Sequence, residues 1–238
     1  MEPFPLRIQS IARKNHLTIS EEQLSQLSKY VSLLVDWNSK INLIARSDVQ
    51  NVWSNHILHS LSILFFVSFP TGARVLDLGT GGGLPGIPLA ILRSDLHLTL
   101  LDSIAKKTKA VQDMVGNLGL RNAAVETGRA ESFEVQSRLK LSFDVVIARA
   151  VAPLVDLIKW SKPLLRQMGH LSSAPESGFG GRHFPTPYVL TLKGGDLSQE
   201  IDSAKLKTKP KKVEKLELVF EGSEEIGLQD KKIIIVQF

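Results

Sequence analysis

The sequence predicts an α/β fold with a mostly parallel, doubly wound sheet. From Arg74 onward, short apolar segments alternate with segments of helical periodicity, which is typical of strands joined by helices. A glycine-rich turn at Gly79–Gly86 follows the first expected strand, as it does in nucleotide-binding sheets. Two more strand-like segments, Leu216–Phe220 and Ile233–Phe238, should close the sheet as a terminal antiparallel pair.

The part before Arg74 has helical character. Ser20 is a good N-cap, and Gln23 stands where a capping box requires a glutamine. A second helix is expected from about Asp48 and should end at Pro70–Gly72. We therefore expect residues 1–70 to form an N-terminal helical extension and residues 71–238 to form the main domain.

The main domain divides into alternating elements. The expected strands are Arg74–Leu78, Leu96–Leu101, Ala123–Thr127, Phe143–Ile147 and Tyr188–Leu192, and the expected helices are Ile87–Leu92, Lys106–Leu118 and Leu154–Leu165. Ser172–Pro187 is expected to be an exposed loop, and Lys205–Lys215 a lysine-rich surface segment. Since ligands bind at the carboxyl ends of parallel strands, the loops after the first four strands should converge on one site.

Composition limits the class of protein. Of the 238 residues, 43% are hydrophobic and 22% charged, which is typical of a folded domain. The absence of cysteine excludes disulfides and thiolate metal sites. No apolar run is long enough to span a membrane, and Met1–Ser10 lacks the apolar core of a signal peptide, so we expect a cytoplasmic protein. The net charge of +5 suits a nucleic acid partner but does not require one.

The glycine-rich turn begins just after Asp77. Gly81, Gly83 and Gly86 fit the pattern G-x-G-x-x-G, which in so glycine-rich a run is weak support for a dinucleotide. A carboxylate at Asp77 would oppose a pyrophosphate. The same carboxylate would favour S-adenosylmethionine, which carries an ammonium and a sulfonium group and no phosphate. We interpret the turn, including Asp77, Gly79 and Gly81, as a site for that cofactor.

Asp102 stands at the end of the second expected strand. An acidic residue about 20 residues beyond such a glycine loop typically binds ribose, because a carboxylate can accept hydrogen bonds from both hydroxyls. The alternative is that Asp102 caps the helix that follows it.

At this point the chain resembles a known family. The run Asp77–Ala90, DLGTGGGLPGIPLA, is similar to the cofactor motif of the GidB/RsmG family, the bacterial ribosomal RNA small-subunit methyltransferases G. Further matches from about Leu33 to Gly195 are Trp37-Asn38, Ile41–Leu43, Asp102-Ser103, Lys106-Lys107, Gly128–Glu131, Arg149–Val151 and Lys193-Gly194. The Leu-Pro-Gly-Ile-Pro segment is much more specific than a general methyltransferase glycine loop.

The resemblance implies a class I methyltransferase fold, which is Rossmann-like, with an N-terminal helical extension. It also implies methylation of N7 of one guanine in 16S rRNA, with S-adenosylmethionine as the methyl donor. By position in the motifs, the cofactor contacts fall on Gly79, Leu84, Ala130, Glu131 and Arg149.

The chain departs from the family pattern in two places. His59 stands where the family usually has an aspartate, which puts a substrate role of that helix in doubt. The connection at Gly169–Pro187 is longer than usual and indicates a local insertion.

Arg149, which follows the fourth expected strand, is our candidate for orienting the target guanine. An arginine there could contact guanine O6, a phosphate or the methionine end of the cofactor, or else form only a surface ion pair. Lys106, Lys107 and Arg129 are candidate RNA contacts. The run of lysines at Lys205–Lys215 is either a second RNA contact or a solvated surface.

We expect no catalytic triad and no metal. Guanine N7 has a free lone pair and loses no proton on methylation, so catalysis should come mostly from alignment. His56 and His59 have the spacing of metal ligands on a helix, but without a third ligand they are more simply a partly exposed structural pair.

The expected partner is 16S rRNA or the small ribosomal subunit, including an assembly intermediate, and the expected state is a monomer. A small-molecule methyltransferase and a non-catalytic RNA-binding assembly factor remain as alternatives, and a nicotinamide-dependent oxidoreductase is disfavoured by Asp77.

Overall fold

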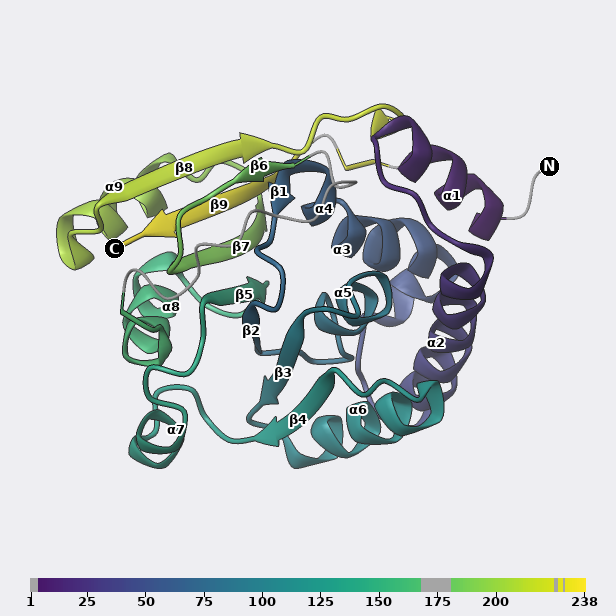
Figure 1. The fold of residues 1–238 in the computed structure, drawn as a ribbon, viewed down its shortest axis with the longest axis horizontal. Helices are drawn as coiled ribbons and strands as arrows, with labels where there is room; N and C mark the ends of the chain where they lie inside the picture. Colours follow the sequence, from purple (N-terminus) through teal and green to yellow (C-terminus); the bar gives the residue numbers. More distant parts are fainter. Residues whose placement is uncertain (1–3, 168–180, 225–226, 229) are drawn as a thin grey trace.

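The computed structural model describes residues 4–167, 181–224, 227–228 and 230–238. Its centre is a 7-stranded sheet with the order β4-β3-β2-β5-β7-β9-β8 (Figure 1). The strands are β2 (Arg74–Leu78), β3 (His97–Asp102), β4 (Ala123–Thr127), β5 (Val145–Arg149), β7 (Tyr188–Gly194), β8 (Lys212–Glu217) and β9 (Lys231–Gln237). The strands from β4 to β7 are parallel, whereas β9 is antiparallel to both β7 and β8. The predicted sheet with its antiparallel terminal strands is therefore confirmed.

Helices cover both faces of the sheet (Figure 1). One face carries α1 (Phe4–Lys14), α2 (Glu21–Lys40), α3 (His59–Leu61), α4 (Ile63–Phe66), α5 (Gly86–Leu92) and α6 (Ala105–Leu118). The other carries α7 (Phe133–Arg138), α8 (Leu154–Ser161), a 3-10 turn η3 (Lys162–Leu164) and α9 (Ser198–Thr208). Alternate strand residues supply two buried clusters, one containing Ile147 and Leu190 and the other Val146 and Val189.

The N-terminal helices pack onto the sheet through the first of these clusters. Helix α2 begins with the predicted capping box, because Ser20 Oγ accepts from the Gln23 amide while Gln23 Oε1 accepts from the Ser20 amide. Leu27 and Leu34 on this helix are fully buried in the same cluster as Ile147. The boundary proposed near residue 70 stays a prediction.

The second expected helix is more irregular than predicted. It starts as a 3-10 turn η1 (Arg46–Asn51), continues as a π-helix η2 (Trp53–Leu58) and only then becomes α-helical in α3 and α4. A small parallel pair, β1 (Val67–Ser68) with β6 (Arg182–His183), follows. β6 lies within the segment expected to be a loop, and residues 169–180 of the predicted insertion lie outside the described residues.

Several boundaries differ from the sequence predictions. β5 starts two residues later than expected, because Phe143 bonds to the backbone of Leu164 instead of extending the strand. Arg149 is consequently the last residue of β5 and does not follow it. The lysine-rich segment expected at Lys205–Lys215 is the end of α9 and the start of β8.

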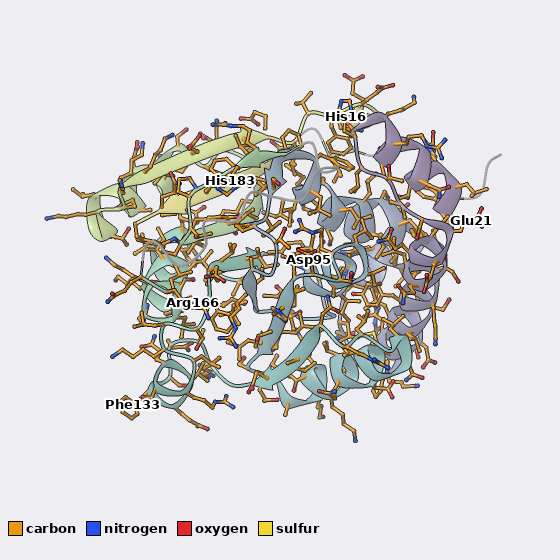
Figure 2. All side chains as sticks on the ribbon, in the orientation of Figure 1. His16, Glu21, Asp95, Phe133, Arg166 and His183 are labelled. Carbon is orange, nitrogen blue, oxygen red and sulfur yellow. The ribbon has the colours of Figure 1, made fainter. Side chains whose placement is uncertain are left out.

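A buried arginine lies in the turn between α5 and β3. Arg93 is 1% exposed and forms two 2.7 Å hydrogen bonds to Asp95, which is labelled in Figure 2. Phe133 on α7 is the opposite case, since it is 87% exposed and extends outward from the body of the molecule (Figure 2). Within the described residues, no helix is long and apolar enough to cross a membrane.

Candidate functional site

The glycine-rich turn joins β2 to α5, and a buried carboxylate holds it in shape. Asp77 is fully buried, and its Oδ2 accepts hydrogen bonds from Thr80 Oγ1 at 2.6 Å and from the Gly86 amide at 2.9 Å. Burial raises the pKa of Asp77 to about 6, against the opposing effect of these two hydrogen bonds. Asp77 thus lies beneath the turn, where it braces the backbone that faces the cavity.

Two of the glycines are required by close packing. Gly79 has φ +74°, and a Cβ on it would lie 2.5 Å from Cγ2 of Val151. A Cβ on Gly86 would collide with Leu100 and lie 2.6 Å from Oδ2 of Asp77. The backbone of the turn can therefore pack directly on β3 and on the segment after β5.

Asp102 ties the end of β3 to the glycine turn. Its Oδ2 accepts from the Gly81 amide and its Oδ1 from the Ile104 amide, both at 2.9 Å. The residue at the N-cap position of α6 is Ile104, which makes no side-chain cap, so Asp102 does not cap that helix. Each carboxylate oxygen retains lone-pair capacity for a ligand hydroxyl.

Two adjoining cavities meet at the glycine turn, where Gly79, Lys107 and Ala150 line both of them. The smaller has a volume of about 360 Å³, and the larger has a volume of about 750 Å³. The smaller one brings together the predicted residues Gly79, Asp102, Lys107, Arg129, Ala130 and Glu131. The larger one brings together Gly79, Gly81, Leu84, Lys107 and Arg149. Lys106 is exposed beside Lys107 on α6.

The smaller cavity also has an aromatic wall that sequence reasoning missed. Trp160 on α8 lines it together with Val151. Ala130 is buried, whereas Glu131 is exposed and its Oε1 lies 3.5 Å from NH1 of Arg129. Helix α7 begins only at Phe133 with Ser132 as its cap, so Glu131 lies before the helix and is free to face a ligand.

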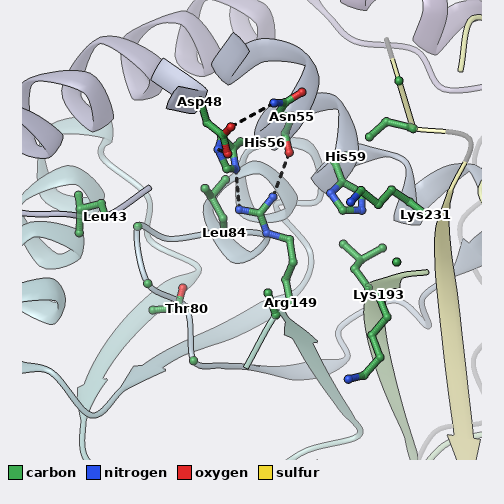
Figure 3. Close-up of a pocket in the computed structure, with 18 of the residues that line it drawn as sticks. Leu43, Asp48, Asn55, His56, His59, Thr80, Leu84, Arg149, Lys193 and Lys231 are labelled. Carbon is green, nitrogen blue, oxygen red and sulfur yellow. Dashed lines mark hydrogen bonds and ion pairs between the residues drawn. The ribbon is translucent and has the colours of Figure 1, made fainter. Parts of the chain in front are cut away.

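The larger cavity is electropositive. It is lined by Lys107 and by Arg149, Lys193 and Lys231, of which the last three are labelled in Figure 3. The acidic residues on its wall are Asp48 and Glu200. Lys193 is already paired, because its Nζ lies 2.7 Å from Oε1 of Glu200. The remaining positive charges suit a carboxylate, a phosphate or the acceptor edge of a base.

Arg149 projects from the end of β5 to the π-helix η2 (Figure 3). Its NH1 donates to the backbone carbonyl of Asn55 at 3.2 Å, and its NH2 lies 2.8 Å from Nδ1 of His56. Burial lowers the pKa of Arg149, but the side chain is an arginine and stays charged. Two of its donors are thus held by the helix, which fixes the guanidinium in the wall of the cavity.

The contact with Arg149 determines the tautomer of His56. Arginine can only donate, so Nδ1 of His56 accepts, and the hydrogen of the neutral ring is on Nε2. That Nε2 lies 3.2 Å from Oδ2 of Asp48, which in turn accepts from the Asn55 amide group at 3.4 Å through Oδ1. Burial and the charge of Arg149 lower the pKa of His56 to about 4, so the ring is neutral at neutral pH.

His56 and His59 are not the partly exposed structural pair expected from the sequence. Both are 7% exposed, and both line the larger cavity. The sequence did contain a signal, since the two residues share a helix face. Their role depends on Arg149, which is 93 residues from His56 along the chain, and local periodicity cannot show such a contact. Among the described residues, no group of three potential metal ligands is present.

Comparisons with known proteins show to which family the chain belongs. The family model described as rRNA small subunit methyltransferase G matches residues 23–173, which is more than half of the chain. The chain belongs to this family. A family member from Phocaeicola vulgatus named ribosomal RNA small subunit methyltransferase G is 42% identical over 80% of this chain and 82% of its own length. One of the same name from Bacteroides fragilis is 38% identical over 92% of this chain and 94% of its own length.

Solved structures of other proteins share the fold of this chain at low sequence identity. A predicted O-methyltransferase from Agrobacterium tumefaciens has a TM-score of 0.54 with 13% identity, over 75% of this chain and 79% of its own. The pre-rRNA processing protein fibrillarin from Methanococcus jannaschii has a TM-score of 0.50 with 14% identity, over 71% of this chain and 67% of its own. The family is one of methyltransferases, and S-adenosylmethionine is the cofactor.

Proposed function

We propose that the chain transfers a methyl group from S-adenosylmethionine to N7 of one guanine in 16S rRNA. The observation that carries this proposal is the pair of cavities that meet at Gly79, one suited to the cofactor and the other electropositive. We further propose that it acts in the cytoplasm as a monomer, on the rRNA or on the small subunit, including an assembly intermediate.

The smaller cavity fits the adenosine part of the cofactor. Asp102 has lone pairs left for the ribose hydroxyls, and Ala130, Glu131 and Trp160 surround the place of the adenine. Asp77 acts through the turn that it braces, because its carboxylate is fully buried.

Gly79, Gly81 and Leu84, which line the larger cavity, would hold the methionine part of the cofactor. Arg149 is placed to bind its carboxylate or to orient the guanine, and the network behind Arg149 leaves it little freedom to turn. When bound, the cofactor would supply an electrophilic methyl group on its sulfonium. The N7 lone pair would attack the methyl carbon in line with the carbon–sulfur bond, which breaks as the new bond forms and leaves the demethylated cofactor as a neutral thioether. The chain's own contribution is alignment, as no proton has to be removed from the base.

RNA is guided to the opening by basic side chains. Lys106 is exposed, Lys107 lines both cavities, and the side chain of Arg129 is 74% exposed. These charges would contact phosphates around the extruded guanine.

Mass mapping of 16S rRNA from cells with and without this chain tests the proposal. The expected result is one guanine that carries an extra methyl group only when the chain is present. Calorimetry with the purified chain should show binding of S-adenosylmethionine and none of NAD. Cofactor binding without any rRNA methylation would favour a small-molecule methyltransferase, and RNA binding without cofactor binding would favour an assembly factor.

A further inference from the structure

The wall of the larger cavity carries a histidine and a lysine that the cofactor site does not use. His59 is the first residue of α3, and Lys231 is the first residue of β9. Figure 3 shows the two side chains together on this wall, to one side of Arg149.

His59 presents an acceptor. Its Nε2 is buried without a hydrogen-bond partner, and the ring's hydrogen bond is made with the backbone of Asn55. A carbonyl can only accept, so the hydrogen of the neutral ring is on Nδ1 and Nε2 carries a lone pair. Burial, followed by the charges of Arg149 and Lys231, lowers the pKa of His59 to about 3, so the ring is neutral at neutral pH.

Lys231 presents a donor beside that acceptor. Its ammonium is close enough to His59 to lower the pKa of the imidazole. Among the described residues, no carboxylate lies within ion-pair distance of Lys231, in contrast to its neighbour Lys232. An unpartnered buried acceptor is unfavourable until a ligand donates to it, and here the ligand must also accept from the ammonium.

We propose that His59 and Lys231 read the Watson–Crick edge of the target guanine, with Nε2 of His59 accepting from N1–H and Nζ of Lys231 donating to O6. Guanine places an acceptor, O6, directly beside a donor, N1–H. Adenine places a donor, its amino group, beside an acceptor, N1, so both contacts would be repulsive. The inference rests on the proposed function and names the residues that select the base.

The two contacts leave N7 free to react. N7 lies on the other side of O6 from N1 in the purine ring, so a base held by O6 and N1–H still offers its N7 lone pair. In the cavity, Gly79 and Thr80 line the side from which the methyl group would come. His59 and Lys231 are therefore specificity-determining residues, while Arg149 and the glycine turn align the reaction.

The experiment replaces the target guanine in an rRNA fragment by two analogues. Inosine keeps O6 and N1–H but lacks the 2-amino group, whereas 2-aminopurine keeps that amino group and lacks O6 and N1–H. The unaltered chain should methylate guanine and inosine at similar single-turnover rates and 2-aminopurine slower by about tenfold or more. His59→Leu should slow guanine and inosine by about tenfold and leave 2-aminopurine unchanged. His59→Asp should restore the preference, because a carboxylate accepts.

Two controls and one further variant separate the outcomes. His183→Leu makes the same substitution at an exposed residue of β6 (Figure 2) and should change no rate. The cofactor dissociation constant of His59→Leu should equal that of the unaltered chain, which reports the integrity of the fold. Lys231→Met tests the same reading independently and should also lower the guanine-to-2-aminopurine ratio.

A guanine-to-2-aminopurine ratio that is unchanged in both His59→Leu and Lys231→Met would overturn the assignment while leaving the proposed function intact. Equal rates on guanine and 2-aminopurine by the unaltered chain would do the same. Absence of methyl transfer to the guanine RNA by a chain that binds S-adenosylmethionine would overturn the proposed function, and the base-reading role with it.

Discussion

At the scale of single residues, Asp102 and Arg149 each hold a segment of backbone and also line a cavity. Asp102 accepts from the Gly81 amide beside the smaller cavity, and Arg149 donates to the Asn55 carbonyl beside the larger one. Asp102 could be singled out because it stands at the end of a strand about 20 residues beyond a glycine turn. Its carboxylate contacts that turn, and its contact with ribose stays a prediction. The roles of His56 and His59 could not be predicted from the sequence, because the residues that act on them lie on β5 and β9, which are distant in the chain. Arg149 was correctly placed at the strand end, but its partners on the π-helix were unforeseen.

The alignment of Arg149 can be tested from its supporting residue. His56→Leu removes the acceptor at Nδ1, whereas His56→Asn keeps an oxygen near that position. We expect His56→Leu to slow single-turnover methyl transfer by about tenfold to a hundredfold, as Arg149→Lys should, since small misplacement of an aligning group is costly. RNA affinity should fall little in either variant. If Arg149→Lys were slow and His56→Leu were as fast as the unaltered chain, the positioning role of His56 would be wrong.

Asp102 should contribute to cofactor affinity through its remaining lone pairs. Asp102→Ala removes hydrogen bonds to a charged acceptor, at a cost of about 1.5–3 kcal/mol, or roughly tenfold to a hundredfold in the dissociation constant. Calorimetric titration with S-adenosylmethionine measures this change. Because Asp102 also holds the Gly81 and Ile104 amides, thermal unfolding of the variant must be recorded beside it. A dissociation constant equal to that of the unaltered chain would leave Asp102 with a purely structural role.

At the scale of elements, helices and strands with a strong apolar pattern were predicted well, and elements held by tertiary contacts were not. Helix α9 was missed because Ala204 is its one buried residue and most of its other residues are polar. The strand expected at Leu216–Phe220 lies instead at Lys212–Glu217. Its position is determined by pairing with β9, whereas the prediction followed the hydrophobicity of the segment itself. The π-helix has no sequence signature of its own.

The packing of the glycine turn gives a prediction for the element as a whole. Gly86→Ala forces a methyl group against Leu100 and the Asp77 carboxylate, so it should destabilise the fold by about 1–3 kcal/mol. Gly116→Ala is the matched control, because the site has open space within α6 and alanine favours helices by about 0.5–1 kcal/mol. Urea unfolding of the two variants should show shifts of opposite sign. A stable Gly86→Ala protein with intact cofactor binding would contradict this account of the turn.

At the scale of the whole molecule, the sheet topology separates two groups of lysines. β8 starts with Lys212 opposite Gln237, at the end of the sheet where the parallel strands begin, away from their carboxyl ends. Lys207 and Lys209 at the end of α9 lie just before it in the chain. Lys106 and Lys107 lie instead beside the cavities.

RNA affinity should reflect that separation. Replacing Lys106 and Lys107 with alanine should weaken binding of an rRNA fragment and reduce the salt slope by about 0.7–0.9 for each phosphate that is no longer neutralised. Lys207→Ala with Lys209→Ala removes the same charge elsewhere and should leave the slope nearly unchanged. RNA affinity measured across a range of salt concentrations gives these slopes. A larger effect from Lys207→Ala with Lys209→Ala would place the RNA at the opposite end of the sheet.

The buried titratable groups predict how stability depends on pH. The folded-state pKa values of His56 and His59 lie below the ordinary value of 6.5, so the unfolded chain binds more protons and stability is lost as pH falls from about 6.5 towards 4. Asp77 acts in the opposite direction between about pH 6 and 4, because its folded-state pKa is raised. The two histidine shifts together exceed the Asp77 shift, so the net free energy of unfolding should fall by several kcal/mol.

Urea unfolding at a series of pH values checks this expectation. His59→Leu removes the larger histidine shift, and its stability should decline less steeply between pH 6.5 and 4 than that of the unaltered chain. Two parallel profiles would show that His59 does not titrate differently in the folded and unfolded states.

The position of β9 has a consequence for the order of biosynthesis. This strand lies inside the sheet, between β7 and β8, yet it is made after both of them. Until it has left the translating ribosome, β7 has an open edge, β8 has no partner within the sheet, and Lys231 cannot reach the cavity. A protein that folds as a unit therefore gains its complete site only after this late segment is released.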